Sequence, residues 1–388
     1  MSFWIILTYI DWFLFIWCAI TVIYLGVFAF TSLFVRHSET PKAKKQNRFI
    51  ILMPSHKNGK SIELTINSIL GQTYPQRLFD VTVIADHEDE ITLFHLAQQP
   101  VTLLTPNYDK SSRTKSLQLA INNLPQFKIY DIAIILDAGD VVEPEFLEQM
   151  NDAYESAGTK AIQTHKLSFN RDTVSARLSA IFEEINNSIF RRGHISLGLP
   201  CTLQSSGYAF DFVWLKDYLQ YAKPSWSEKE MEVTLTRQHI YIDYFDKIVI
   251  YGEKARQAED FNRQHRSWIL AQWKTFIHNV HYLPAAIANR HYDMIDRLFQ
   301  WMLLPRMIMM TIIVLMCVVI PFIYFSIAVK WWYIFAIVLF IFAMATPNYL
   351  VDDKWNSTFF KIPVVFMSSF LQKFKLGRKF IDAVNLKQ

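Results

Sequence analysis

The sequence contains little cysteine and little excess charge of either sign. Its three cysteines, Cys18, Cys201 and Cys317, are too widely spaced for a zinc motif or a disulfide framework, so no oxidising compartment is required. The formal net charge of +4 is small and spread along the chain, which argues against a nucleic-acid partner. The chain also contains no internal repeat and no low-complexity segment. Its class therefore has to be inferred from its hydrophobic pattern.

Hydrophobic residues, by contrast, make up 52% of the 388 residues and include 31 Phe and 11 Trp. This content is high for a soluble protein, so part of the chain is expected to lie in lipid. Residues 12–35 carry no charge and exceed the roughly 20 residues that a membrane-spanning helix needs. The N-terminus lacks the basic leader and the cleavage site of a secretory signal, so we expect this helix to be retained.

Charged residues beside the apolar runs predict a multi-pass topology. The positive-inside rule places the end of the first helix in the cytoplasm, because it is followed by Arg36, Lys42, Lys44, Lys45 and Arg48. Two further uncharged runs, 307–329 and 331–349, are separated only by Lys330, which predicts a membrane hairpin with a tight outer turn at this lysine. The tail mixes apolar and basic residues, as expected of an amphipathic segment on the inner leaflet rather than of a plain soluble tail.

Between the membrane segments, the pattern alternates between strands and helices. Buried strands are predicted at 49–53 and 81–85, with a helix between them at 61–70, which makes a βαβ unit. A third buried strand, 132–136, ends at Asp137. Ligands gather beyond the carboxyl ends of strands in open α/β sheets, and carboxylates there can hold a divalent metal. A polar turn without a ligand would have the same composition.

These stretches resemble the membrane-bound members of glycosyltransferase family 2, which include cellulose and hyaluronan synthases. The resemblance covers roughly residues 47–275 and rests first on ILMPSHKNGKSIELTINSILGQTYP and VTVIADHEDE. It implies the GT-A fold, a Rossmann-like α/β domain that binds nucleotide sugars. By this match Pro54, His56 and Asp86 contact the base, while Arg113 and Lys115 lie near the diphosphate.

The run ILDAGD corresponds to the Asp-x-Asp metal motif of the family, with Asp137 at the first position and Gly139 at the second. The resemblance implies a Mg²⁺ or Mn²⁺ ion held by Asp137. Asp140 either replaces the missing second ligand through a small shift of the turn, or the metal binds weakly.

Three other segments resemble motifs on the acceptor side of the family. SEKEMEVTL, 227–235, resembles the segment of the catalytic base, and its alignment puts either Glu230 or Lys229 at that position. Because a charged lysine cannot accept a proton, we prefer Glu230, with Glu228 as the second candidate. RQHRSW resembles the Gln-x-x-Arg-Trp motif and QSSGYAF a glycine-containing acceptor loop. They contribute Gln264, Arg266, Trp268, Ser206 and Gly207.

The sequence therefore predicts four parts: an N-terminal membrane helix with a basic linker (1–46), a cytoplasmic GT-A domain (47–298), a membrane hairpin (299–352) and an interfacial tail (353–388). The resemblance implies an inverting glycosyltransferase of the cell membrane that transfers a sugar, from a UDP-sugar donor, to a lipid-linked or glycan acceptor. Three motifs are altered: Gly139 stands at the second aspartate of the metal motif, Lys229 precedes Glu230 in the base motif, and Ser267 stands at the arginine of the Gln-x-x-Arg-Trp motif. The alternative is therefore a weak or inactive homologue that serves as a binding or assembly subunit. A nucleotide-binding membrane protein without transfer activity is the third interpretation.

Overall fold

The computed structural model describes the chain except for residues 1–2, 35–39, 58, 60, 254–257 and 351–388. The predicted interfacial tail thus lies outside the described residues. The chain divides into two compact units. One, the sheet unit, comprises Val35–Asn170 and Phe190–Lys254, and the other, the helical unit, comprises Met1–Phe34, Arg171–Ile189 and Ala255–Gln388.

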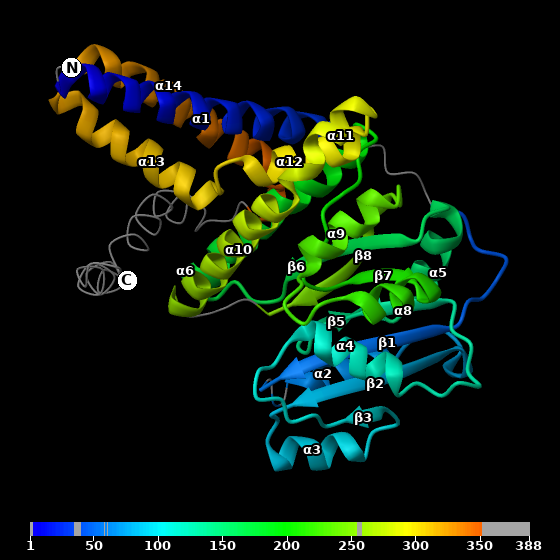
Figure 1. Cartoon of the computed structure of the whole chain (residues 1–388). Coiled ribbons are helices and arrows are strands. Elements are labelled where there is room, and N and C mark those ends of the chain that lie inside the picture. The colour runs from blue at the N-terminus through cyan, green and yellow to red at the C-terminus, as the bar shows by residue number, and fades with distance from the viewer. Residues whose placement is uncertain (1–2, 35–39, 58, 60, 254–257, 351–388) are drawn as a thin grey trace. The chain divides into compact units, whose positions relative to one another are not determined.

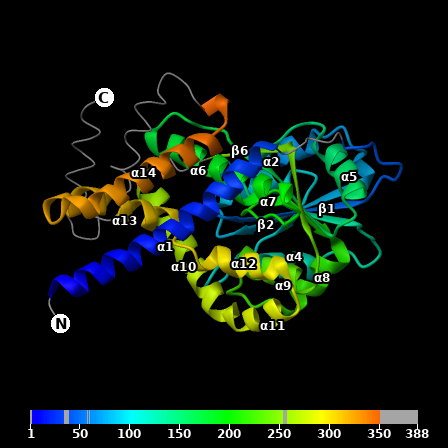
Figure 2. The same ribbon diagram turned by 90° about the horizontal axis from the view of Figure 1, so that it is seen from above.

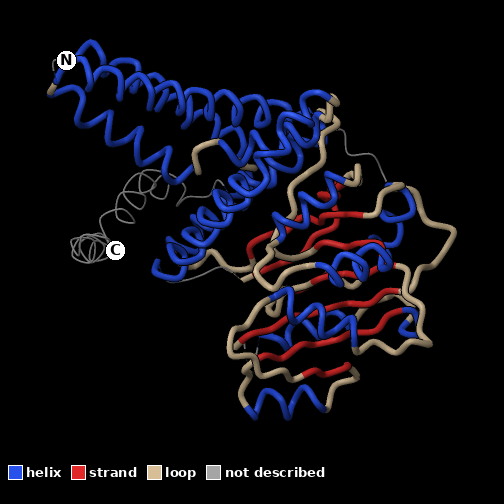
Figure 3. The backbone as a smooth tube through the Cα atoms, in the orientation of Figure 1, coloured by secondary structure: helices blue, strands red, loops and turns tan. Residues whose placement is uncertain are grey.

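The sheet unit is built on one eight-stranded sheet with the strand order β3-β2-β1-β4-β7-β6-β8-β5 (Figures 1 and 3). Within the group β1 to β4, every pair of adjacent strands is parallel. Strand β7 runs antiparallel to both of its neighbours, β4 and β6. The strands are β1 Phe49–His56, β2 Phe79–Asp86, β3 Thr102–Leu104, β4 Ile132–Ile135, β5 Val141–Val142, β6 Ala161–Ser168, β7 Tyr208–Asp211 and β8 Ile242–Gly252. All three predicted strands are present.

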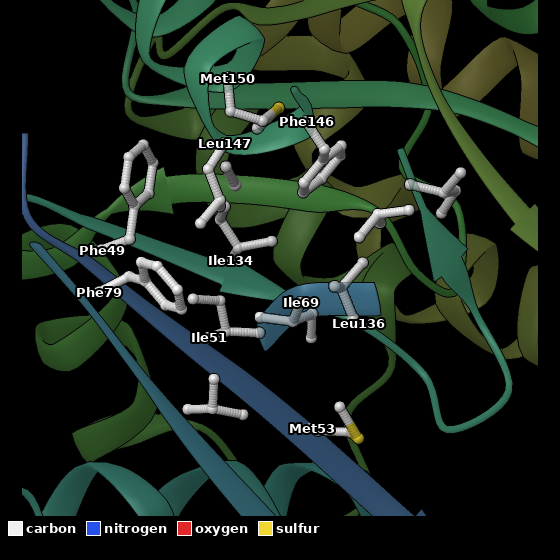
Figure 4. Packing of buried hydrophobic residues seen from close by; sticks show 14 of the residues in the cluster. Phe49, Ile51, Met53, Ile69, Phe79, Ile134, Leu136, Phe146, Leu147 and Met150 are labelled. Atoms are coloured by element: carbon white, nitrogen blue, oxygen red, sulfur yellow. The ribbon is translucent and has the colours of Figure 1, made fainter. Parts of the chain in front are cut away.

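Helices cover both faces of this sheet, which is why its central strands are apolar without interruption. Along β1, Phe49, Ile51 and Met53 point into one core, and the residues between them point into the other. Figure 4 shows the first of these cores. The helices of the unit are α2 Ser61–Leu70, α3 Glu90–Ala97, α4 Arg113–Asn122, α5 Phe146–Ala157, α7 Gly193–Ser196, α8 Phe212–Tyr221 and α9 Glu228–Arg237, with the short η2 Gln76–Leu78.

The parallel arrangement brings the carboxyl ends of β1, β2 and β4 to one edge. His56 and Asp86 pair in register as the last residues of β1 and β2. Beside them, the backbone N–H of Leu136, which follows β4, donates to Leu52 O at 3.1 Å. The next residue, Asp137, therefore lies at the same edge as Asp86.

The helical unit contains the apolar helices. Helices Ile5–Phe34 and Phe325–Ala345 are each long and apolar enough to cross a membrane. Tyr292–Met302 and Arg306–Phe322 form a bent pair of helices that would make a third candidate span if the two together cross the membrane once. Helices α1 and α14 run side by side in both views (Figures 1 and 2). The helices of this unit are α1 Phe3–Thr31, η1 Ser32–Phe34, α6 Val174–Asn186, α10 Ala258–Asn279, η4 Val280–Tyr282, α11 Leu283–Ala288, α12 Tyr292–Met302, α13 Arg306–Val319, η5 Ile320–Phe322, α14 Phe325–Ala345 and η6 Asn348–Leu350, and the π-helix η3 Asn187–Arg192 crosses the unit boundary.

The prediction of a turn at Lys330 is wrong, because this lysine lies inside α14. The chain turns between α13 and α14 at η5 and the two residues after it. The ammonium of Lys330 pairs with the carboxylate of Asp11 on α1, and Trp331 Nε1 donates to the same carboxylate at 2.7 Å. Lys330 Nζ also lies 3.9 Å from the centroid of the Trp12 ring. Charges within a membrane segment are tolerated when they are paired in this way.

Candidate active site

A cavity of about 440 Å³ opens at the carboxyl edge of the sheet. Its walls include five residues that the sequence singled out: Pro54, His56, Asp86, Arg113 and Asp137. They come from the ends of β1 and β2, from the first turn of α4 and from the loop after β4. The fold therefore gathers in one place residues that are up to 83 positions apart in the chain, from Pro54 to Asp137.

At one end of the cavity, Asp86 is almost fully buried, with 1% of its surface exposed. His87 Nδ1 lies 2.7 Å from its Oδ1, and His56 Nδ1 lies 3.3 Å from its Oδ2, which accepts no hydrogen bond within the described structure. Burial opposes ionisation of this carboxyl, but hydrogen bonds from Ser111 and His87 outweigh it and lower its pKa. Asp86 is thus an ionised acceptor with one oxygen available for a ligand N–H.

At the other end, Arg113 is the first residue of α4. Its Nη1 donates to Asp137 Oδ1, its Nε lies 3.4 Å from Glu228 Oε1, and its guanidinium carbon lies 5.9 Å from the centroid of the Tyr208 ring. Burial would lower the pKa of Arg113, but the surrounding acidic groups raise it well above its usual value. Its Nη2 is buried near Tyr208 and has no well-formed hydrogen bond to a described residue, which makes it a candidate donor to an anionic ligand.

The second predicted diphosphate residue, Lys115, points elsewhere. Its Nζ donates to Lys110 O at 3.0 Å and lies 5.4 Å from the centroid of the Tyr108 ring. Lys115 is not among the residues that line the cavity. Of the two basic residues, the structure brings only Arg113 to the site.

The predicted metal ligands already have partners within the protein. Asp137 is paired with the arginine, and Asp140 is buried. Lys166 Nζ lies 2.7 Å from Asp140 Oδ1, and the Ser206 hydroxyl donates to Asp140 Oδ2. Gly139 contributes no side chain. A divalent ion at this edge needs carboxylate oxygens that are not already paired with basic groups, so these residues do not fit one in this arrangement.

A different group at the cavity can hold a metal ion. The ligand atoms of His56, Asp86 and His87 lie within 4.8 Å of one another. The sequence had assigned His56 and Asp86 to the base of a nucleotide instead. Since neutral imidazoles and a carboxylate are common metal ligands, both uses are chemically consistent with these side chains.

The start of α9 presents one of the two candidate bases to the arginine. Glu228 is the first residue of this helix and lies next to Arg113, whereas Glu230 lies roughly 200° further around the helix axis. Glu232 shares the face of Glu228, is buried, and accepts a hydrogen bond from Leu203 N at 2.8 Å. Burial raises the pKa of Glu228, and Asp137 adds to this, while Arg113 opposes it.

Comparisons with known proteins place this arrangement in a family. A family model described as glycosyl transferase family group 2 matches residues 132–347, which is more than half of the chain. The chain belongs to glycosyltransferase family 2. It is therefore a glycosyltransferase by family, as the sequence had predicted. A search among curated proteins found no match.

This family 2 chain is similar to several solved structures, one of which supports its fold. A mannosyltransferase from Pyrobaculum calidifontis, solved with GDP-Man and Mn²⁺, is 10% identical, with a TM-score of 0.51, and the match covers 93% of this chain and 99% of that one. Crystalline TarS from S. aureus is 14% identical, with a TM-score of 0.39 over 58% of this chain, and the match spans only 39% of the TarS chain. The predicted GT-A fold is confirmed.

The acceptor-side residues of this family 2 chain divide between the two units. Ser206 reaches the site because its hydroxyl donates a hydrogen bond to Asp140 Oδ2. The next residue, Gly207, has a φ of +72°. A Cβ at Gly207 would lie 2.3 Å from Ile250 Cδ1, so only glycine fits there. The other three predicted residues are on α10, in the helical unit, and their role stays a prediction: Gln264, Arg266 and Trp268.

Sequence reasoning missed three residues of the site. Lys166 lies on β6 in a run that is otherwise buried, and a charged residue in such a run was the available signal. Tyr208 and His87 gave no signal of their own, because a tyrosine at a strand start and a histidine after a strand are ordinary. Their proximity to Arg113 and Asp86 arises only from the fold.

Proposed function

We propose that this family 2 chain is an inverting glycosyltransferase anchored in the cell membrane. It transfers a sugar from a nucleotide-sugar donor, a UDP-sugar, to a lipid-linked or glycan acceptor. The observation that supports donor binding best is the cavity that joins Asp86, with an acceptor oxygen available, to Arg113, with a donor N–H available. The two apolar helices of the helical unit support membrane association.

Donor binding follows from the chemistry of the two ends. The base places a ring N–H against Asp86, because an ionised carboxylate only accepts hydrogen bonds. The diphosphate lies against Arg113 at the start of α4, where the guanidinium and the helix N-terminus both favour negative charge. Arg113 then stabilises the charge that develops on the departing diphosphate.

The transfer itself is a direct displacement at the anomeric carbon. Glu228 accepts the proton of the acceptor hydroxyl as its oxygen bonds to the carbon, and the bond from that carbon to the diphosphate oxygen breaks. The nucleoside diphosphate leaves with both electrons of that bond. Attack from the opposite side inverts the configuration, so an α-linked donor gives a β-linkage.

We choose Glu228 over Glu230 because Glu228 adjoins the arginine that holds the diphosphate. Its raised pKa also suits a base, since a group with a higher pKa holds a proton more strongly. Helix α9 is fixed against α4 by a hydrogen bond from Thr114 Oγ1 to Trp226 O at 3.0 Å, just before the helix begins. The position of Glu228 beside Arg113 is thereby supported by the surrounding structure.

The second candidate is an inactive homologue that binds nucleotides as an assembly subunit. The observation that favours it is that Gly139 has no side chain to bind a metal, while Asp140 is already paired with Lys166 and Ser206.

The two functions differ in their products. Membranes that contain the chain and a panel of nucleotide sugars should yield a glycosylated product by mass analysis, and the Glu228→Gln variant should not. Nucleotide binding without product or donor hydrolysis would favour the subunit.

A further inference from the structure

Lys166 is a buried cation next to both aspartates at the sheet edge. Only 8% of its side chain is exposed. Its Nζ lies 2.7 Å from Asp140 Oδ1 and 4.0 Å from Asp137 Oδ2. Removing an ammonium group from water is costly unless carboxylates compensate, so this placement depends on the two aspartates.

The sheet leaves space for this pair at Gly252, the last residue of β8. A Cβ at Gly252 would lie 2.3 Å from Lys166 Cε and 2.7 Å from Asp140 Oδ1. Strands β6 and β8 are neighbours, and Ser168 pairs with Gly252 in register. A side chain at position 252 would have to displace Lys166 and Asp140, so the glycine leaves room for the pair within the sheet.

Both aspartates at this edge already have a basic partner. Arg113 pairs with Asp137 and Lys166 with Asp140, and Glu228 adds a third carboxylate beside Arg113. A divalent ion between the aspartates would lie within a few ångströms of the ammonium and be repelled by it. At the position where the family motif has a second aspartate, Gly139 has a φ of +97° and donates its N–H to Thr65 Oγ1 at 2.8 Å.

We propose that Lys166 takes the place of a divalent cation at this edge, so that the chain binds a nucleoside diphosphate without a metal ion. This inference rests on the proposed function and concerns the same site. Lys166 is a positioning residue: it holds Asp140, which accepts a hydrogen bond from Asp137 N at 3.3 Å, and so fixes the loop that carries Asp137. Arg113, oriented by Asp137, supplies the charge that contacts the diphosphate.

The test is nucleotide binding by the full chain in detergent, measured by calorimetry with UDP and with GDP, in EDTA and in Mn²⁺. We expect affinities that agree within about threefold between the two conditions. A loss of about tenfold or more in EDTA would overturn the proposal while leaving the proposed function intact. Absence of binding in both conditions would overturn the proposed function and this inference with it.

Two variants extend the test. Lys166→Met removes the charge but keeps most of the volume, and Lys216→Met makes the same change at an exposed position of α8. In EDTA, Lys166→Met should weaken UDP binding by about tenfold or more, and Mn²⁺ should restore part of the loss. The control should behave like the parent.

The gain of Mn²⁺ dependence is the decisive readout, because damage to the fold alone would weaken binding equally with and without the ion. A folded Lys166→Met protein that binds UDP in EDTA as the parent does would refute the role of Lys166. If this variant does not fold, the comparison of the parent in EDTA and Mn²⁺ still decides the proposal.

Discussion

The assignment of the catalytic base can be tested at Glu228. In Glu228→Gln the side chain keeps its size but cannot accept a proton, and the neighbouring Arg113 keeps its hydrogen bond to Asp137. Loss of a positioned base costs about a hundredfold to ten-thousandfold in rate. Since Arg113 and Asp86 are untouched, the affinity for the nucleotide should change little.

The assay separates these two effects. Single-turnover transfer from a radiolabelled nucleotide sugar gives the rate, and calorimetry with UDP gives the affinity. Glu230→Gln, on the same helix, is the matched control and should lose much less activity. Glu228→Asp should retain part of it, because the carboxylate remains but lies one methylene further from the acceptor.

The pH profile gives an independent check. A base works when ionised, so the rate should fall as the pH drops through the pKa of Glu228. Burial raises that pKa, so the fall should begin at a higher pH than for an ordinary glutamate. If Glu230→Gln lost the activity and Glu228→Gln kept it, our assignment would be refuted and the base would be Glu230.

Three further predictions concern the same chain. Arg113→Lys should weaken UDP binding by about tenfold, measured by calorimetry, because an ammonium cannot reproduce the forked contacts of the guanidinium. Gly207→Ala should lower the free energy of unfolding by at least about 1–3 kcal/mol in denaturant titrations, because the new methyl group overlaps a neighbouring side chain. A reporter fused after Tyr324 should be external and one fused after Gln388 cytoplasmic, and the opposite pattern would contradict the topology.

The central sheet could be predicted because its signal is local. The apolar run 132–136 and the polar residue that ends it indicate both a buried strand and a site at its end. The same holds for Asp86 at the end of β2. The position of Arg113 at the start of a helix could be predicted, because the apolar residues of that helix recur with regular helical spacing.

The partners of Asp137 and Asp140 within the protein could not be predicted, because they come from strands and loops that are distant in sequence and are brought together only by the strand order of the sheet. Strand β7 lies between β4 and β6, and this order is what brings Lys166 and Ser206 to Asp140. Our proposal of Glu228 rather than Glu230 rests on where α9 begins and on which side of the helix faces Arg113. A short sequence motif does not fix either property.

The turn near Lys330 shows a related limit. A single lysine between two apolar runs is typical of a loop, and nothing nearby in the sequence indicates that its partner is Asp11. The two residues are 319 positions apart. Long-range pairing of this kind overrides the local pattern.

That pair also constrains the order of assembly. During synthesis, α1 emerges first, with an aspartate within its apolar length, and the lysine that neutralises this aspartate belongs to the last apolar helix described. An uncompensated carboxylate in a membrane segment is costly, so α1 alone is a poorer membrane span than its hydrophobicity suggests. We therefore expect α1 to be more stable as a membrane span when α14 is present to pair with Asp11.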